Sequence, residues 1–168
     1  MYEKKAAYSY PELIDCGYGL WGDVPSLPLP PMLMFDRIIE IKSDGGKYGK
    51  GVARAQFDIK PDLWFFPCHF YRDPVMPGCL GIDALWQLTG FFLGWSGARG
   101  NGRALGCGGI KFHDQVLPTA GLLTYVVDIK MMRISRKGSM VISDGCLLRD
   151  GEPIYEAAEL KVIVVPEE

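Results

Sequence analysis

The sequence has few of the residues that build disulfide frameworks and metal centres. Its five cysteines are an odd number, widely spaced and without a CxxC pair, which favours a reducing compartment over a disulfide scaffold or a zinc site. Only two histidines are present. A metal site built from His69, Asp73 and Asp83 would lack both a second helical histidine and a pair of thiolates, so we expect no metal site.

The chain also lacks a strong charge of either sign. Its formal net charge is −2, so nothing in the overall balance indicates binding to nucleic acid or to an anionic membrane. The charges are nevertheless uneven, because residues 99–137 hold seven cations and two anions, and residues 144–168 hold seven anions and two cations. Two solvated faces are the simpler interpretation, and a docking surface is the alternative.

The sequence contains neither a signal-peptide pattern nor a convincing membrane span. The stretch MYEKKAAYSYPELIDCG has no apolar central region and no small-residue cleavage site, so we expect a cytoplasmic protein. The apolar run Cys79–Trp95 is shorter than the roughly twenty residues that a span needs, and it contains Asp83 and Gln87. We interpret this run as a central helix that is buried on almost every side.

The remaining pattern predicts a single α+β domain over residues 1–168. Residues 1–32 predict a short helix over about 11–16, after the capping-box pair Ser9 and Glu12, followed by a proline-rich extended lead-in. β-rich stretches predict strands at residues 34–41, 48–57, 103–112, 122–134, 140–148 and 154–165. We expect these strands to form a curved antiparallel sheet wrapped around the long helix.

Asp83 is the unusual residue of the long helix. A carboxylate buried among apolar side chains is costly unless it is paired or hydrogen-bonded, and Gln87 lies four residues later on the same helix face. A general acid that must hold and release a proton would explain such a residue. The alternative is a core aspartate that only holds a loop in place, and the residue pattern favours neither.

His69 precedes the helix in an aromatic stretch. Histidine is the usual general base near neutral pH, although a lone histidine among aromatics is more often a packed core residue. Pro77 and Gly78 shift this balance towards chemistry, because the free N–H groups at a helix start can bind negative charge on a carbonyl oxygen. A glycine there also lets a substrate approach the backbone closely. A base, an acid and an oxyanion donor are thus candidates within one segment.

Three other features have simpler interpretations. Cys68 and Cys79 are expected to be buried apolar fillers. His113 is expected at the end of a strand, with no chemical role. The stretch GARGNGRALGCGG resembles a phosphate-binding loop, but it does not lie between a strand and a helix of a βαβ unit.

Five long motifs, in this order, resemble the bacterial 3-hydroxydecanoyl acyl-carrier-protein dehydratase/isomerase family. They are LPLPPMLMFDR, DLWFFPCHF, DPVMPGCLGIDALWQLTGFFLGW, GRALG and VLPTA. The resemblance extends from about Tyr8 to Val164. It implies a hot-dog fold, in which an antiparallel sheet wraps a long central helix, and assembly as a homodimer.

The resemblance also implies roles for individual residues. The catalytic histidine of the family falls on His69 and the catalytic aspartate on Asp83, and the two act as a pair from different subunits. The backbone N–H of Gly78 corresponds to the group that polarises the thioester carbonyl. An aspartate rather than a glutamate at position 83 resembles the members that both dehydrate and isomerise.

The implied substrate is a 3-hydroxyacyl thioester on the phosphopantetheine of an acidic acyl carrier protein, with no metal or redox cofactor. Expected substrate-binding residues are Gln87, Cys68, Phe92 and Trp95, with Phe91 and Leu93 as further candidates for an apolar tunnel. Expected docking residues for the carrier are the cations Arg103, Lys130, Arg133, Arg136, Lys137 and Lys161. The pair Tyr71-Arg72 departs from the smaller, less charged pair that is common in the family.

Three other functions stay open at this point. A hot-dog thioesterase would hydrolyse the same kind of substrate with water activated by the carboxylate. A dehydratase without isomerase activity would stop at the trans-2-enoyl product. A non-catalytic acyl-binding module would keep its biological activity without His69 and Asp83.

Overall fold

A computed structural model describes residues 2–166 of the chain. Two helices and seven strands follow one another along the sequence. The elements are α1 (Tyr10–Gly17), β1 (Arg37–Lys42), β2 (Val52–Asp58), α2 (Gly78–Trp95), β3 (Asn101–Gly106), β4 (Gly109–Phe112), β5 (Leu122–Arg133), β6 (Ser139–Arg149) and β7 (Glu152–Val165).

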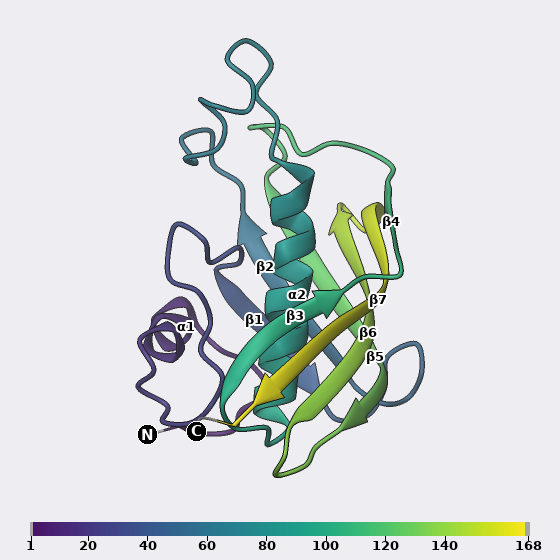
Figure 1. Ribbon diagram of the computed structural model, residues 1–168. Helices are drawn as coiled ribbons and strands as arrows, with labels where there is room; N and C mark the ends of the chain where they lie inside the picture. Colours follow the sequence, from purple (N-terminus) through teal and green to yellow (C-terminus); the bar gives the residue numbers. More distant parts are fainter. Residues whose placement is uncertain (1, 167–168) are drawn as a thin grey trace.

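All seven strands belong to one antiparallel sheet that curves around helix α2 (Figure 1). The strand order is β1-β2-β5-β6-β7-β3, and β4 pairs with β7 beyond the end of β3. Strands β5, β6 and β7 are the longest and form the middle of the sheet, because tight turns connect them in sequence. The expected hot-dog architecture, a central helix wrapped by an antiparallel sheet, is confirmed.

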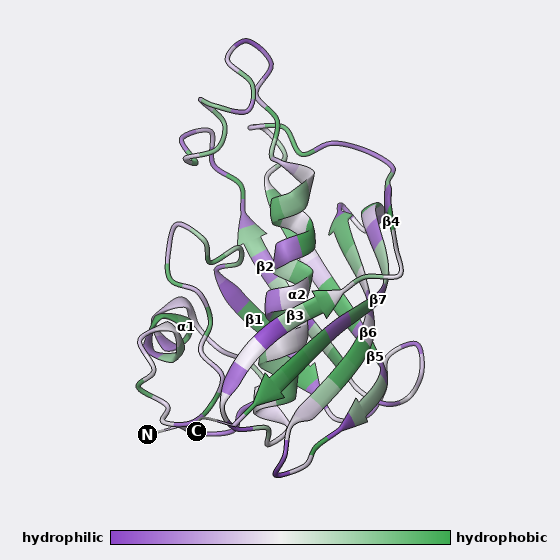
Figure 2. Ribbon diagram, in the orientation of Figure 1, coloured by the Kyte–Doolittle hydropathy of each residue, from purple (hydrophilic) through white to green (hydrophobic). Residues whose placement is uncertain are grey.

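Helix α2 is the core element of the fold. Its side chains are apolar almost all round, and Leu85, Leu88 and Leu93 have no exposed surface. Fully burying a leucine side chain stabilises a fold by roughly 1.5–3 kcal/mol, so this helix contributes much of the stability of the domain. Figure 2 shows short hydrophilic bands on an otherwise weakly polar or hydrophobic α2. The polar residues of this helix include Asp83 and Gln87.

The N-terminal lead-in is fixed to the rest of the domain by hydrogen bonds and aromatic contacts. The capping box is confirmed, since the backbone N–H of Ser9 donates to Glu12 Oε2 at 2.8 Å at the start of α1. Tyr8 forms an isolated bridge with Ile38, and its ring meets that of Phe91 edge-on at 5.1 Å. The lead-in therefore reaches α2 and β1 and covers part of the central helix.

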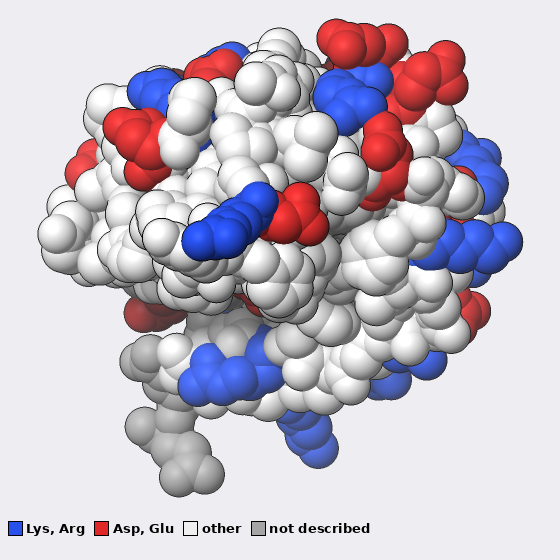
Figure 3. All heavy atoms as spheres, turned by 90° about the horizontal axis from the view of Figure 1, so that it is seen from above, with Lys and Arg blue, Asp and Glu red and all other residues white. Residues whose placement is uncertain are grey.

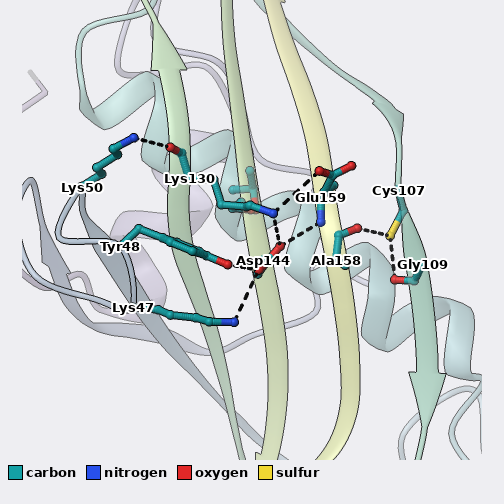
Figure 4. Close-up of polar contacts among 11 residues, drawn as sticks. Lys47, Tyr48, Lys50, Cys107, Gly109, Lys130, Asp144, Ala158 and Glu159 are labelled. Carbon is teal, nitrogen blue, oxygen red and sulfur yellow. Dashed lines mark hydrogen bonds and ion pairs between the residues drawn. The ribbon is translucent and has the colours of Figure 1, made fainter.

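The strand expected over residues 103–112 is not continuous. β3 ends at Gly106 and β4 begins at Gly109, because the facing strand β7 has a bulge at Glu159, whose backbone is left-handed with φ 55°. The bulge releases the N–H of Glu159 from the ladder, and this N–H donates to Asp144 Oδ1 at 3.0 Å. Asp144 also accepts a hydrogen bond from Tyr48 and lies 3.6 Å from the Nζ of Lys130 (Figure 4).

The first two strands are shorter at their start than expected. β1 begins at Arg37 rather than at residue 34, and β2 begins at Val52 rather than at residue 48. Residues 45–51 instead form a glycine-rich turn with four left-handed glycines. In this turn, the N–H of Lys47 donates to Asp128 Oδ1 at 2.8 Å, so the turn is bound to the outer face of β5.

Residues 59–77 form a long strap between β2 and α2. The strap extends beyond the N-terminal end of α2 (Figure 1) and carries three of its aromatic side chains exposed, namely those of Trp64, Phe70 and Tyr71. Figure 3, viewed from above this end, shows mostly uncharged surface, with charged side chains around its border and also basic and acidic side chains close together near its middle. Between residues 2 and 166, no helix combines the length and the apolar character that crossing a membrane requires.

Candidate active site

His69 lies in the strap, and its imidazole is held in one orientation. Its Nδ1 lies 2.9 Å from the carbonyl oxygen of Val75, while its backbone carbonyl accepts the N–H of Val75 at 2.8 Å. The ring stacks on Phe70, with centroids 4.2 Å apart. A carbonyl oxygen can only accept, so Nδ1 carries a proton, and in the neutral form of the ring Nε2 is therefore the acceptor.

The segment beyond His69 is a small closed turn. The N–H of Phe70 donates to the carbonyl of Asp73 at 3.0 Å, and the N–H of Asp73 donates back to Phe70 at 3.1 Å. Tyr71 and Arg72 form the exposed tip of this turn, with the guanidinium carbon of Arg72 5.7 Å from the Tyr71 ring centroid. The turn and the Val75 contacts together fix the position of the imidazole.

Asp83 lies on the second turn of α2 and is half-buried, so one side of it can meet a ligand. Its Oδ2 accepts a hydrogen bond of 2.6 Å from Gln87 Nε2. The same Nε2 also donates to the carbonyl of Met32 at 2.8 Å, and Gln87 Oε1 accepts the N–H of Met34 at 3.1 Å. Both protons of the amide are thus in use, and Gln87 orients Asp83 against the chain of the lead-in.

A pocket of about 260 Å³ opens beside Asp83 and follows one face of α2. The helix contributes residues at the spacing of a single face, and the other walls come from the lead-in and from β3. The lining residues are Pro25, Ser26, Leu27, Pro28, Asp83, Trp86, Gln87, Gly90, Phe91, Gly102, Arg103, Ala104 and Val162. An acid at one end of a mainly apolar channel suits a substrate with an apolar tail and a polar reacting end.

Gly78 is the first residue of α2 and follows the N-cap residue Pro77. Because a helix has no carbonyl four residues earlier at this point, the N–H of Gly78 has no partner within the helix. The ring of Phe112 from β4 covers the residue closely, and a Cβ at position 78 would lie 2.7 Å from its Cε1 atom. A side chain at position 78 would therefore have to displace the Phe112 ring, and a glycine also lets a ligand approach the backbone.

Within one chain, the structure does not bring His69 and Asp83 into one pocket. His69 is absent from the walls of the pocket beside Asp83, and no hydrogen bond joins the two side chains within the part of the chain that is described. His69 and Gly78 both lie at the N-terminal end of α2, and Asp83 lies one to two turns further along the helix.

The other expected substrate-binding residues lie in different places. Cys68 in the strap and Cys79 in the first turn of α2 are exposed, so the expectation that they are buried fillers was wrong, because neither position has a covering layer in the single chain. Phe92 is fully buried against Trp95, whose Nε1 donates to the carbonyl of Lys5 at 2.7 Å. Of the aromatic residues at this end of α2, Phe91 borders the pocket.

The expected carrier-docking cations do not share one environment. Arg103 lines the Asp83 pocket, and its Nη1 donates to the carbonyl of Gly102 at 2.6 Å. Lys130 lies near Asp144 and 3.7 Å from Glu159, so its charge is partly matched within the chain. The remaining cations are on the far end of β5, in the β5–β6 turn and on β7, at Arg133, Arg136, Lys137 and Lys161.

Two residues of α2 that line the pocket, Trp86 and Gly90, were not predicted from the sequence. Trp86 borders the pocket, and its Nε1 donates to the carbonyl of Gly106 at 3.2 Å, where β3 ends. Gly90 borders the pocket one turn beyond Trp86. The sequence did contain a pattern that indicates both residues, because positions 83, 86, 87, 90 and 91 have the spacing of one helix face. No group of three potential metal-ligating side chains occurs among residues 2–166.

His113 lies beyond the end of β4 and pairs with Glu156, with its Nε2 2.5 Å from the carboxylate.

The long central helix wrapped by one antiparallel sheet defines a hot-dog protein. A family model described as the FabA-like domain matches residues 27–158, which is most of the chain. The chain therefore belongs to the FabA-like domain family.

Solved structures of other proteins share this fold. The dehydratase heterocomplex ApeI:P from Xenorhabdus doucetiae matches with a TM-score of 0.62 and 16% identity, covering 83% of this chain and 87% of that chain. AziG from S. sahachiroi matches with a TM-score of 0.52 and 13% identity, covering 77% and 90%. An HP0420 homologue from Helicobacter felis matches with a TM-score of 0.51 and 14% identity, covering 86% and 98%. At these identities the likeness concerns the fold.

Proposed function

We propose that the protein dehydrates (3R)-hydroxyacyl thioesters to trans-2-enoyl thioesters and isomerises the product to the cis-3-enoyl form, in the synthesis of unsaturated fatty acids. The observation that carries the proposal is the fixed tautomer of His69. Its Nδ1–H is bound by a backbone carbonyl, which leaves Nε2 as a base of defined direction.

In the dehydration step, Nε2 of His69 removes a proton from C2 of the substrate. The carboxyl group of Asp83 gives its proton to the hydroxyl group on C3, which leaves as water while the C2–C3 double bond forms. The N–H of Gly78, together with the helix start behind it, stabilises the negative charge that develops on the thioester oxygen. Proton transfer from the imidazolium to the carboxylate restores the starting state. No step is an oxidation or a reduction, so no redox cofactor is required.

The isomerisation uses the same groups in new positions. His69 removes a proton from C4 of the trans-2-enoyl thioester, and Asp83 delivers a proton to C2, so that the double bond moves to C3. This step needs an acid that can reach C2 after dehydration. The hydrogen bond from Gln87 fixes one oxygen of Asp83 and leaves its other oxygen free for the substrate.

The pair acts across a homodimer in this proposal. In the single chain, His69 does not line the pocket of Asp83, so a complete site requires a histidine from elsewhere. Exposed apolar side chains on the edge strands and the strap, including Leu105, Ile110, Phe112 and Phe70, provide surface for a second copy. The acyl group arrives on the phosphopantetheine of an acidic carrier protein, and the cations on β5 and the β5–β6 turn are its docking residues.

The decisive experiment follows the fate of a 3-hydroxydecanoyl thioester by chromatography. Enoyl thioester without free thiol supports dehydration, and free thiol without enoyl product would show a thioesterase instead. Accumulation of the trans-2 product with no cis-3 product would remove the isomerase half of the proposal. The variants His69→Ala and Asp83→Asn should each lose about 10²- to 10⁴-fold in kcat, the usual contribution of general acid–base catalysis.

A further inference from the structure

Helix α2 contains a glycine that the packing of the chain does not explain. A glycine inside a helix is destabilising by roughly 0.5–1 kcal/mol relative to alanine, so each one calls for a reason. A Cβ at Gly81 would lie 2.4 Å from the ring of Tyr155, and a Cβ at Gly94 would lie 2.9 Å from the ring of Pro25. Both glycines are thus required by a close neighbour.

Gly90 has no such neighbour. A Cβ built there meets only Val162, at 3.5 Å, which is an ordinary contact distance. Its backbone is helical, so an alanine would fit without strain and would improve the helix propensity. What a side chain at position 90 would occupy is the pocket beside Asp83, which Gly90 borders.

Gly90 and Phe91 are the last residues of α2 that line the pocket. On the same helix face, Pro25 of the lead-in rests on Gly94 one turn later, and the ring of Phe91 borders the pocket beside Gly90. The open space over Gly90 is therefore the last turn of the channel that begins at Asp83. A side chain at this position would fill the part of the pocket that is farthest along α2 from Asp83 and would leave the part beside Asp83 unchanged.

We infer that Gly90 sets the length of acyl chain that the site accepts, by leaving empty the part of the pocket that is farthest along α2 from Asp83. This inference rests on the proposed function, because it places the acyl chain along α2 with C3 beside Asp83. Seven residues of helix separate Asp83 from Gly90, a rise of about 10.5 Å. An extended acyl chain advances about 1.25 Å per carbon, from bonds of about 1.5 Å with tetrahedral angles, so the seven carbons beyond C3 of a ten-carbon chain extend about 9 Å. The terminal methyl group of that chain, with a contact radius of about 2 Å, therefore meets a side chain at position 90.

The test compares the binding of saturated six-carbon and ten-carbon acyl pantetheine thioesters, measured by calorimetry on the full-length protein and on Gly90→Ala and Gly90→Leu. The six-carbon chain ends well short of Gly90, and its affinity should be the same in all three proteins. The ten-carbon chain should bind about tenfold more weakly or worse to Gly90→Leu, and to an intermediate extent to Gly90→Ala. Dehydration of the matching 3-hydroxyacyl thioesters should follow the same order.

Leu88→Ala is the matched control, because Leu88 is a fully buried α2 residue outside the pocket wall. It loosens the core and should lower the melting temperature without changing the ratio of ten-carbon to six-carbon affinity. Unchanged ten-carbon binding in Gly90→Leu would overturn the inference. So would dissociation of the Gly90→Ala protein in size-exclusion chromatography, since the glycine would then serve contact between subunits. If the affinity ratio shifts as expected but the wild-type protein forms no enoyl product, the proposed reaction fails while the length-setting role of Gly90 stands.

Discussion

The cross-subunit pairing of His69 and Asp83 can be tested by mixing two inactive variants. In the single chain, the His69 ring is fixed by Val75 within the strap, and it is not part of the pocket that Asp83 borders. If each active site takes its histidine from one subunit and its aspartate from the other, a dimer of one His69→Ala chain and one Asp83→Asn chain has one site with both changes and one site with neither.

The expected magnitude follows from counting sites. An equal mixture that exchanges freely forms half mixed dimers, and each mixed dimer has one intact site of two, so about a quarter of the wild-type activity should return. Each variant alone should retain only about 10⁻² to 10⁻⁴ of that activity, so the recovery is large compared with the background. The assay is enoyl thioester formation after the two purified variants are unfolded and refolded together.

A matched control keeps the two variants in separate refolding reactions before they are mixed. Differently tagged chains confirm by affinity capture that mixed dimers have formed. If mixed dimers are present and the mixture is as inactive as either variant, the two residues act within one chain and the cross-subunit mechanism is wrong.

Three further predictions concern hydrogen bonds between distant parts of the chain. Gln87→Leu should lower kcat and also stability, because it removes the partner of Asp83, the general acid that we propose, and leaves a buried lead-in amide unpaired, a loss of about 1–3 kcal/mol in urea unfolding. Asp144→Ala should cost a similar amount, since the N–H of Glu159 loses its acceptor, whereas Asp144→Asn retains an acceptor oxygen and should cost less. Although partial burial opposes ionisation of Asp144, its hydrogen bonds and the nearby lysines hold the pKa of this carboxyl below its usual value. Its contribution is thus present at neutral pH and is lost as the pH falls through the lowered pKa, and the acid side of a pH–stability curve should be shallower in Asp144→Asn. Thr89 Oγ1 and Ser143 Oγ form a fully buried pair at 2.8 Å, so Thr89→Val or Ser143→Ala alone should destabilise the protein by about 1–3 kcal/mol, and the double variant should cost less than the sum of the two.

Much of the architecture could be predicted because it depends on local pattern. The run over residues 79–95 is apolar on every side, and such a segment has few options besides a buried helix. The capping pair Ser9 and Glu12 and the strands after residue 121 were likewise evident, since turn residues separate stretches that favour a sheet. The helical position of Asp83 followed from the same pattern.

The interrupted edge strand could not be predicted from its own residues. The break between Gly106 and Gly109 depends on the bulge at Glu159 in the facing strand, and Asp144 from a third strand satisfies the amide that the bulge releases. The sequence of residues 101–112 indicates neither the bulge at Glu159 nor the role of Asp144. The exposure of Cys68 is similar, because it depends on which segments cover the strap rather than on the apolar character of its neighbours.

The sequence by itself determined the element types and the identity of the chemical groups, since helical spacing and residue chemistry are local properties. Only the tertiary structure decided how those groups are held. His69 is oriented by a carbonyl six residues later, and Gln87 by backbone groups 53 and 55 residues earlier. The tertiary structure also distinguished Gly90 from the glycines of α2 that packing requires. The space available for a side chain at a glycine depends on segments that are distant along the chain.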